Sequence, residues 1–90
     1  MKVLQSRSFQ RKVKKFTKKQ KLLLDEQVKL IVEDPKIGAE KKGDLRGVYV
    51  HKFKIKADLY LMAYRIVDEN LELITIGSHE NYYRNLKKYL

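Results

Sequence analysis

The spacing between apolar residues changes once along this chain, and that change restricts the possible folds more than any other feature of the sequence. Leu24, Val28 and Ile31 recur at intervals of three and four residues, which places them on one face of an α-helix. From Val48 the interval becomes two, as in a β-strand with one apolar face. Helices in the first part and strands in the second predict an α+β fold.

Two helices are predicted before residue 35. Ser8 is a suitable N-cap for the first, which carries apolar residues on one face over residues 9–16. The second begins at Thr17-Lys18-Lys19-Gln20, which matches a capping box, and ends at Asp34-Pro35. Because residues 3–6 read as a short strand, the chain is expected to start with a strand and a helical hairpin.

Three strands are predicted after a loop over residues 36–47. They run from Val48 to Lys56, from Leu59 to Val67 and from Leu71 to Ile76, and a polar turn at residues 68–70 joins the last two. In the first of them, His51 lies on the apolar face and is predicted to be a hydrogen-bonded core residue. The opposite face is cationic and carries Lys52, Lys54 and Lys56.

The end of the chain predicts a strand that turns directly into a helix. Gly77 permits a bend, Ser78 can cap the next turn, and Tyr82 and Tyr83 begin a run with helical spacing. The predicted order is therefore β-α-α-β-β-β-α, an antiparallel sheet with the helical hairpin packed on one face and a short C-terminal helix. The other face of the sheet is left partly open, and function is expected there.

Composition limits the partners and the chemistry. Ninety residues make one domain, residues 1–90, and 21 Lys and Arg against 11 Asp and Glu give a net charge of +10, which predicts an anionic partner. The chain has no cysteine and two histidines, so we expect no metal and no cofactor. No signal peptide or membrane span is recognised, and a cytoplasmic protein is expected.

The side chains near the open face suit the cleavage of RNA. RNA carries its own nucleophile, the 2′-hydroxyl, so cleavage requires positioning, proton transfer and cations. Imidazole is the side chain that exchanges protons near neutral pH, and His79 supplies one, while Tyr82 or Tyr83 supplies a phenol. The lysines could hold phosphates or protect an exposed strand edge, and His79 and the tyrosines could equally be structural.

The whole sequence resembles the RelE/ParE superfamily of bacterial toxins in its small single-domain form. The resemblance rests on residues 8–16 (Ser-Phe-Gln-Arg-Lys-Val-Lys-Lys-Phe), Asp34-Pro35 before a glycine-containing loop, and Asp44-Leu45-Arg46-Gly47 before the sheet. Tyr64 and Gly77-Ser78-His79 complete the pattern. Members are toxins paired with an antitoxin; those resembling RelE cut messenger RNA, commonly in the ribosomal A site, and those resembling ParE poison DNA gyrase.

The resemblance assigns roles to particular residues. Phe53-Lys54-Ile55-Lys56 is similar to the segment whose lysines serve catalysis in RelE, which implies catalytic roles for Lys54 and Lys56. Gly77-Ser78-His79 with Tyr83 is similar to the ending of the YafQ branch, in which the matching histidine is catalytic. Leu61 stands where RelE-like nucleases carry an arginine, and Arg65 is an imperfect substitute.

The sequence thus predicts the toxin of a type II toxin–antitoxin system, a metal-independent endoribonuclease that cuts messenger RNA on the ribosome by 2′-hydroxyl attack. The predicted catalytic residues are His79, Tyr83, Lys54 and Lys56, and the predicted RNA-binding residues are Arg46, Lys52, Tyr82 and Arg65. An acidic antitoxin is the expected protein partner. Two alternatives stay open, a ParE-like gyrase inhibitor and a non-enzymatic RNA-binding module.

Overall fold

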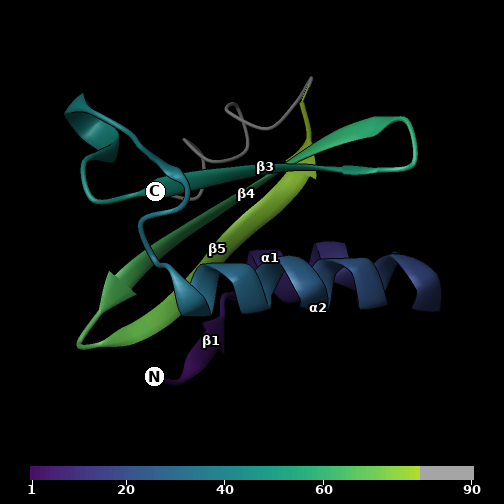
Figure 1. Cartoon of the computed structure of the whole chain (residues 1–90), viewed down its shortest axis with the longest axis horizontal. Coiled ribbons are helices and arrows are strands. Elements are labelled where there is room, and N and C mark those ends of the chain that lie inside the picture. Colours follow the sequence, from purple (N-terminus) through teal and green to yellow (C-terminus); the bar gives the residue numbers. More distant parts are fainter. Residues whose placement is uncertain (80–90) are drawn as a thin grey trace.

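The computed structural model of the chain describes residues 1–79 and has the predicted α+β architecture (Figure 1). The elements are, in order, β1 (Val3–Gln5), α1 (Arg7–Val13), α2 (Lys18–Glu33), β2 (Ala39–Glu40), the 3₁₀ turn η1 (Gly43–Leu45), β3 (Tyr49–Ile55), β4 (Asp58–Val67) and β5 (Asn70–Ser78). The predicted C-terminal helix lies outside the described residues. Among residues 1–79, no helix is both long enough and apolar enough to cross a membrane.

The strands form one sheet in the order β1-β5-β4-β3-β2. Neighbouring strands are antiparallel except β1, which pairs with β5 in parallel and places Val3 opposite Leu71. The two-residue strand β2 lies within the segment predicted as a loop and pairs with the start of β3. One irregularity lies in β5, where Leu73 is opposite Tyr64 and Thr75 is opposite Ala63. Ile74 is therefore the extra residue of a β-bulge.

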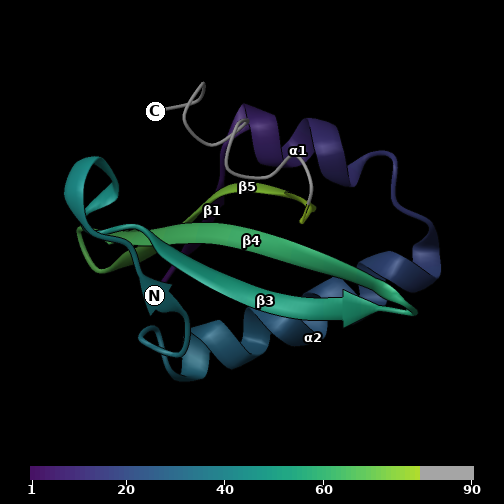
Figure 2. The ribbon, with the colours of Figure 1, turned by 90° about the horizontal axis from the view of Figure 1, so that it is seen from above.

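The two helices cover the sheet in different ways (Figure 2). α2 lies across one face, and α1 packs against β5. The main core lies on the α2 face, where Phe9 of α1, Leu24 of α2 and Tyr64 of β4 belong to one cluster of buried side chains. A second apolar cluster lies on the opposite face, which is therefore not open along its whole length. This second cluster consists of Val48, Val50, Leu61, Ala63 and Ile74.

Helix capping follows the prediction for α2 and departs from it for α1. Thr17 Oγ1 accepts from the Gln20 N–H at 3.1 Å and Gln20 Oε1 accepts from the Thr17 N–H at 2.8 Å, so the capping box is confirmed. The N-cap of α1 is Ser6, whose hydroxyl accepts from the Phe9 N–H at 3.0 Å, and the prediction of Ser8 is wrong. Ser6 is the cap because its N–H also donates to the Leu73 carbonyl at 3.0 Å, which links the start of the helix to the sheet.

The tyrosine hydroxyl of Tyr64 holds the segment after α2 against the sheet. It donates to the Pro35 carbonyl at 2.7 Å and accepts from the Gly38 N–H at 3.0 Å. Its ring is fully buried and stacks on Tyr49 with the ring centroids 5.5 Å apart. Burial raises the pKa of the Tyr64 phenol, so the hydroxyl keeps its proton and can donate.

The predicted bend at Gly77 is wrong. β5 continues to Ser78, with Gly77 opposite Leu61 and Ser78 opposite Tyr60 on β4. Gly77 does not have a positive φ, so its backbone is one that other residues also adopt. The strand continues because β4 itself extends to Asp58 and offers hydrogen-bonding partners as far as that point. The turn begins at His79 instead.

Candidate functional site

The ends of three strands meet at one corner of the sheet. Phe53 of β3 is opposite Tyr60 of β4, and Tyr60 is opposite Ser78 of β5. His79 follows directly, and its N–H donates to the Leu59 carbonyl at 3.2 Å, which ties the turn to β4. An open pocket of about 450 Å³ lies at this corner. It is lined by Ala57, Asp58, Leu59, Tyr60, Ser78 and His79.

Asp58 and Tyr60 line this pocket together with His79, and the sequence did not single out either residue. Asp58 is exposed at the first position of β4. Tyr60 is half-buried, with its ring 6.2 Å from Phe53 and 5.7 Å from Phe16, so the core sets its position. The signal that could have found both is the two-residue turn before β4, which brings the start of that strand to the same end of the sheet as His79.

Lys52 and Lys54 lie as predicted on the face of β3 that points away from α2, and both are exposed. Lys54 is directly opposite Leu59, the residue whose carbonyl holds His79, so its strand position borders the pocket. Lys56 does not share that face, because β3 ends at Ile55. Lys56 has φ of 58° and forms the turn into β4, which corrects its predicted position.

The two predicted arginines do not join this corner. Arg46 precedes β3, and the start of β3 at Tyr49 is about 13 Å along the strand from Phe53. Arg65 forms an ion pair with Glu72, opposite it on β5, and its Nε and Nη2 both lie 2.8 Å from Glu72 Oε1. Leu61, which the resemblance places where RelE-like nucleases carry an arginine, is fully buried in the second apolar cluster.

His51 behaves as the predicted core histidine. Its Nε2 lies 2.7 Å from Gln27 Oε1 of α2, and its ring stacks on Phe53 with the centroids 5.9 Å apart. Burial lowers the pKa of His51, because the charged imidazolium loses hydration. His51 lies on the α2 face of the sheet, away from the lysines.

A second polar cluster joins α1 to the bulge of β5. Lys12 Nζ donates to Thr75 Oγ1 at 2.9 Å, and Ser8 Oγ lies 3.2 Å from the same oxygen. Burial lowers the pKa of Lys12, and the neighbouring Arg11 lowers it further. These contacts position α1 along β5, and they give Thr75, which is almost fully buried, its hydrogen bonds.

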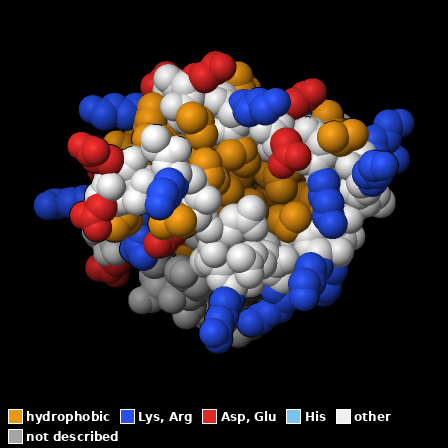
Figure 3. Space-filling view, turned by 90° about the horizontal axis from the view of Figure 1, so that it is seen from below, with side chains coloured by type: hydrophobic (Ala, Val, Ile, Leu, Met, Phe, Trp, Pro, Cys, Tyr) orange, Lys and Arg blue, Asp and Glu red, His pale blue; other side chains and the backbone are white. Residues whose placement is uncertain are grey.

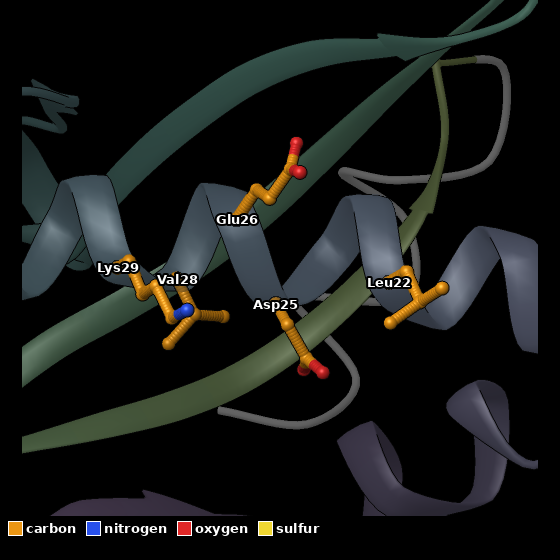
Figure 4. Close-up of a pocket in the computed structure, with 5 residues that line it drawn as sticks. All are labelled: Leu22, Asp25, Glu26, Val28 and Lys29. Atoms are coloured by element: carbon orange, nitrogen blue, oxygen red, sulfur yellow. The ribbon is translucent and has the colours of Figure 1, made fainter.

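Two of the hollows that lie away from the corner are lined by residues of α2. One, of about 480 Å³, is a depression on α2 that is lined by Leu22, Asp25, Glu26, Val28 and Lys29 (Figure 4). None of these residues was predicted to belong to the functional site. The other, of about 280 Å³, lies between α1, α2 and β1 and has Val3, Val13 and Val28 in its lining. The face seen from below in Figure 3 carries hydrophobic side chains at its centre and Lys and Arg side chains along much of its rim.

The predicted site residues therefore divide into three groups. His79 and Lys54 lie at the corner, Lys52 lies two residues away along the strand, and Lys56 lies in the adjoining turn. Arg46 lies toward the other end of the sheet and Arg65 pairs with a carboxylate. Tyr82 and Tyr83 lie outside the described residues.

One family of proteins matches this chain. A family model described as the ParE-like toxin of type II bacterial toxin–antitoxin systems matches residues 3–87. A search of curated proteins found no match.

The solved structures show the fold. A double arginine-to-alanine mutant of E. coli toxin RelE in the free state is 20% identical, with a TM-score of 0.74 over 99% of this chain and 96% of that chain. RelE from the intact E. coli RelBE toxin–antitoxin complex and from its isolated crystal form are both 21% identical. The RelE chain of the complex has a TM-score of 0.69 over 88% of this chain and 96% of that chain. The isolated RelE has a TM-score of 0.66 over 99% of this chain and 98% of that chain. At these identities the likeness establishes a RelE-like fold.

Proposed function

This chain belongs to the ParE-like toxin family of type II bacterial toxin–antitoxin systems, and we propose that it is the toxin that cleaves messenger RNA, as a metal-independent endoribonuclease. One observation carries the proposal: His79, Asp58 and Tyr60, which bear an imidazole, a carboxylate and a phenol, line one pocket at the sheet corner, and Lys54 is opposite Leu59, which also lines it. A gyrase inhibitor needs no proton-transfer group, whereas RNA cleavage by 2′-hydroxyl attack needs one group that accepts a proton and one that donates a proton.

In the proposed reaction the 2′-oxygen of one nucleotide attacks the adjacent phosphorus, and the bond from phosphorus to the 5′-oxygen of the next nucleotide breaks. His79 transfers a proton, either from the 2′-hydroxyl or to the leaving 5′-oxygen. Asp58 lines the same pocket and would orient the imidazole in the complex with RNA, and the Tyr60 hydroxyl or Tyr83 transfers the other proton. The products are a 2′,3′-cyclic phosphate and a 5′-hydroxyl, so atoms and charge balance without a co-reactant.

The lysines stabilise the charge that develops on the phosphorus centre. Lys54 borders the pocket and Lys52 follows on the same face, about 6.6 Å away along the strand, which is close to the spacing of successive phosphates in an extended polynucleotide. Lys56 acts from the turn, and Arg46 and Arg65 contact RNA further along. The net charge of +10 favours RNA binding by release of counterions.

The proposal also includes the partners and the location. The substrate is messenger RNA on the ribosome, in the cytoplasm, and the neutralising partner is an antitoxin with an acidic segment that covers the lysine face. The RelBE complex, a toxin–antitoxin complex with a similar toxin fold, supports an antitoxin partner. The net charge of +10 and the exposed side chains of Lys52 and Lys54 support an acidic antitoxin, because oppositely charged surfaces attract each other.

A gyrase inhibitor is the second candidate. The ParE-like description of the family favours it, and so does Leu61, which stands where RelE-like nucleases carry an arginine and is buried among apolar side chains. It predicts DNA damage without RNA cleavage. A non-enzymatic RNA-binding module would bind RNA and leave it uncut.

Primer extension on RNA from cells that express the chain tests the choice. We expect discrete cuts that His79→Ala reduces by about 10²–10⁴-fold, the usual contribution of a general acid or base. His51→Gln is the matched control, since it changes the other histidine, which faces α2, and should keep the rate within about threefold. If His79→Ala lowers the cleavage rate by less than about threefold, His79 does not act as a general acid or base.

A substrate change tests the nucleophile. Replacing the 2′-hydroxyl at the scissile nucleotide by hydrogen should abolish cutting and leave binding nearly unchanged, because the phosphate contacts remain. The upstream fragment should end in a 2′,3′-cyclic phosphate, and cutting should persist in EDTA when polyamines keep the ribosome intact. A 2′-deoxy substrate that is cut at an unchanged rate would rule out this mechanism.

A further inference from the structure

The outer edge of β3 is paired along only part of its length. β2 pairs with Tyr49 and Val50, and within residues 1–79 no strand pairs with the outer edge of β3 beyond that point. An unpaired strand edge presents main-chain donors and acceptors to any chain that approaches in an extended conformation. Lys52 and Lys54 lie in this stretch.

The main-chain groups of Lys52 and Lys54 point to this edge. The Lys41 N–H donates to the Val48 carbonyl at 2.8 Å, so Val48 directs its carbonyl to the β2 side of the strand. Main-chain groups alternate between the two edges from one residue to the next. Residues 50, 52 and 54 therefore point to the same side as Val48, and an added strand would find the N–H and carbonyl of both lysines.

The surfaces above and below this edge differ in chemistry. On one face the ammonium groups of Lys52 and Lys54 are exposed. On the other face Gln27 of α2 contacts His51, so that side of α2 lies toward β3. Leu23 and Leu30, four residues before and three after Gln27, share its side of the helix and are 38% and 42% exposed.

We propose that the outer edge of β3 binds an extended acidic segment of a protein partner by strand addition. The partner strand alternates acidic and apolar residues: its acidic side chains meet Lys52 and Lys54, and its apolar side chains lie toward Leu23 and Leu30. A second copy of this chain is a poor occupant, because it would place lysines opposite lysines. The proposal rests on the proposed function, which includes an antitoxin partner. It also means that the partner strand and RNA compete for Lys52 and Lys54.

A synthetic peptide of alternating glutamate and valine, about nine residues long, tests the edge directly on the full chain without RNA. In an antiparallel hydrogen-bonded pair, the residues opposite Lys52 and Lys54 would be glutamates, and their N–H groups would face β3. N-methylation of those glutamates should weaken binding by about tenfold or more, since it removes two hydrogen bonds. N-methylation of the intervening valines is the matched control and should change affinity by less than about twofold.

Charge supplies the second arm of the experiment. A peptide with lysine in place of glutamate should bind at least about tenfold more weakly, and the double variant Lys52→Glu and Lys54→Glu should reverse that preference. Three results would overturn the proposal: affinity weaker than about 1 mM, equal loss from both methylated peptides, or a helical bound peptide by NMR. Because no RNA is present, each of these leaves the cleavage assay to judge the proposed function separately.

Discussion

Removal of a single oxygen atom, by Tyr64→Phe, should destabilise the fold measurably. The Tyr64 ring is fully buried, and its hydroxyl holds the Pro35 carbonyl at 2.7 Å and the Gly38 N–H at 3.0 Å. The phenylalanine ring fills the same space, so packing is retained. Only the two hydrogen bonds that join the segment after α2 to β4 are lost.

The magnitude follows from the groups left behind. A buried donor or acceptor without a partner costs about 1–3 kcal/mol. Pro35 and Gly38 are only half-buried, so water can partly replace the hydroxyl and the total should lie near the middle of that range, about 2 kcal/mol. For a domain of this size that corresponds to a fall in Tm of about 8–16 °C.

Urea and thermal unfolding followed by circular dichroism would measure the effect, and faster hydrogen exchange at the Gly38 amide would locate it. Tyr49→Phe is the matched control, because Tyr49 is the ring stacked on Tyr64 and its hydroxyl makes no hydrogen bond within residues 1–79. It should change the free energy of unfolding by less than about 0.5 kcal/mol. Equal effects of the two substitutions would show that the hydroxyl of Tyr64 does not hold this segment.

Three further predictions concern stability. Burial lowers the pKa of His51 below its ordinary value of 6.5, so the unfolded chain takes up a proton first and the protein loses stability as the pH falls below that value. The urea midpoint should therefore fall between about pH 7 and pH 5, and His51→Gln should make that fall smaller. Gly38→Ala would place its Cβ 2.9 Å from the Tyr64 hydroxyl, and it should lower the free energy of unfolding measured in urea by about 1–3 kcal/mol. Thr17→Ala removes the capping box of α2 and should cost about 1 kcal/mol, with no change in RNA cleavage.

Much of the fold could be predicted because the signals are local. The capping box at residues 17–20 and the stop at Asp34 each need only a few neighbouring residues, and both are as predicted. The alternation over residues 49–55 depends only on the pleat of a strand, so the apolar and cationic faces of β3 were also predictable. The RelE-like fold follows from these signals together with the resemblance.

The site was less predictable, because its composition depends on how distant strands pair. Asp58 and Tyr60 reach His79 only through the pairing of β4 with β5, and the bulge at Ile74 sets which residues of β5 share a face before and after it. A one-residue shift in a strand exchanges its two faces, and nothing in the local spacing marks the bulge.

The remaining differences have the same physical origin. Ser6 replaces Ser8 as the cap because β5 supplies it with a partner from the far end of the chain, at Leu73. Gly77 stays extended because β4 offers it a strand to pair with, and Arg65 is taken up by Glu72 across that same pair of strands. Short-range patterns set each helix and strand, while hydrogen bonds and ion pairs between segments far apart in the sequence set the caps, the register and the residues that meet at the site.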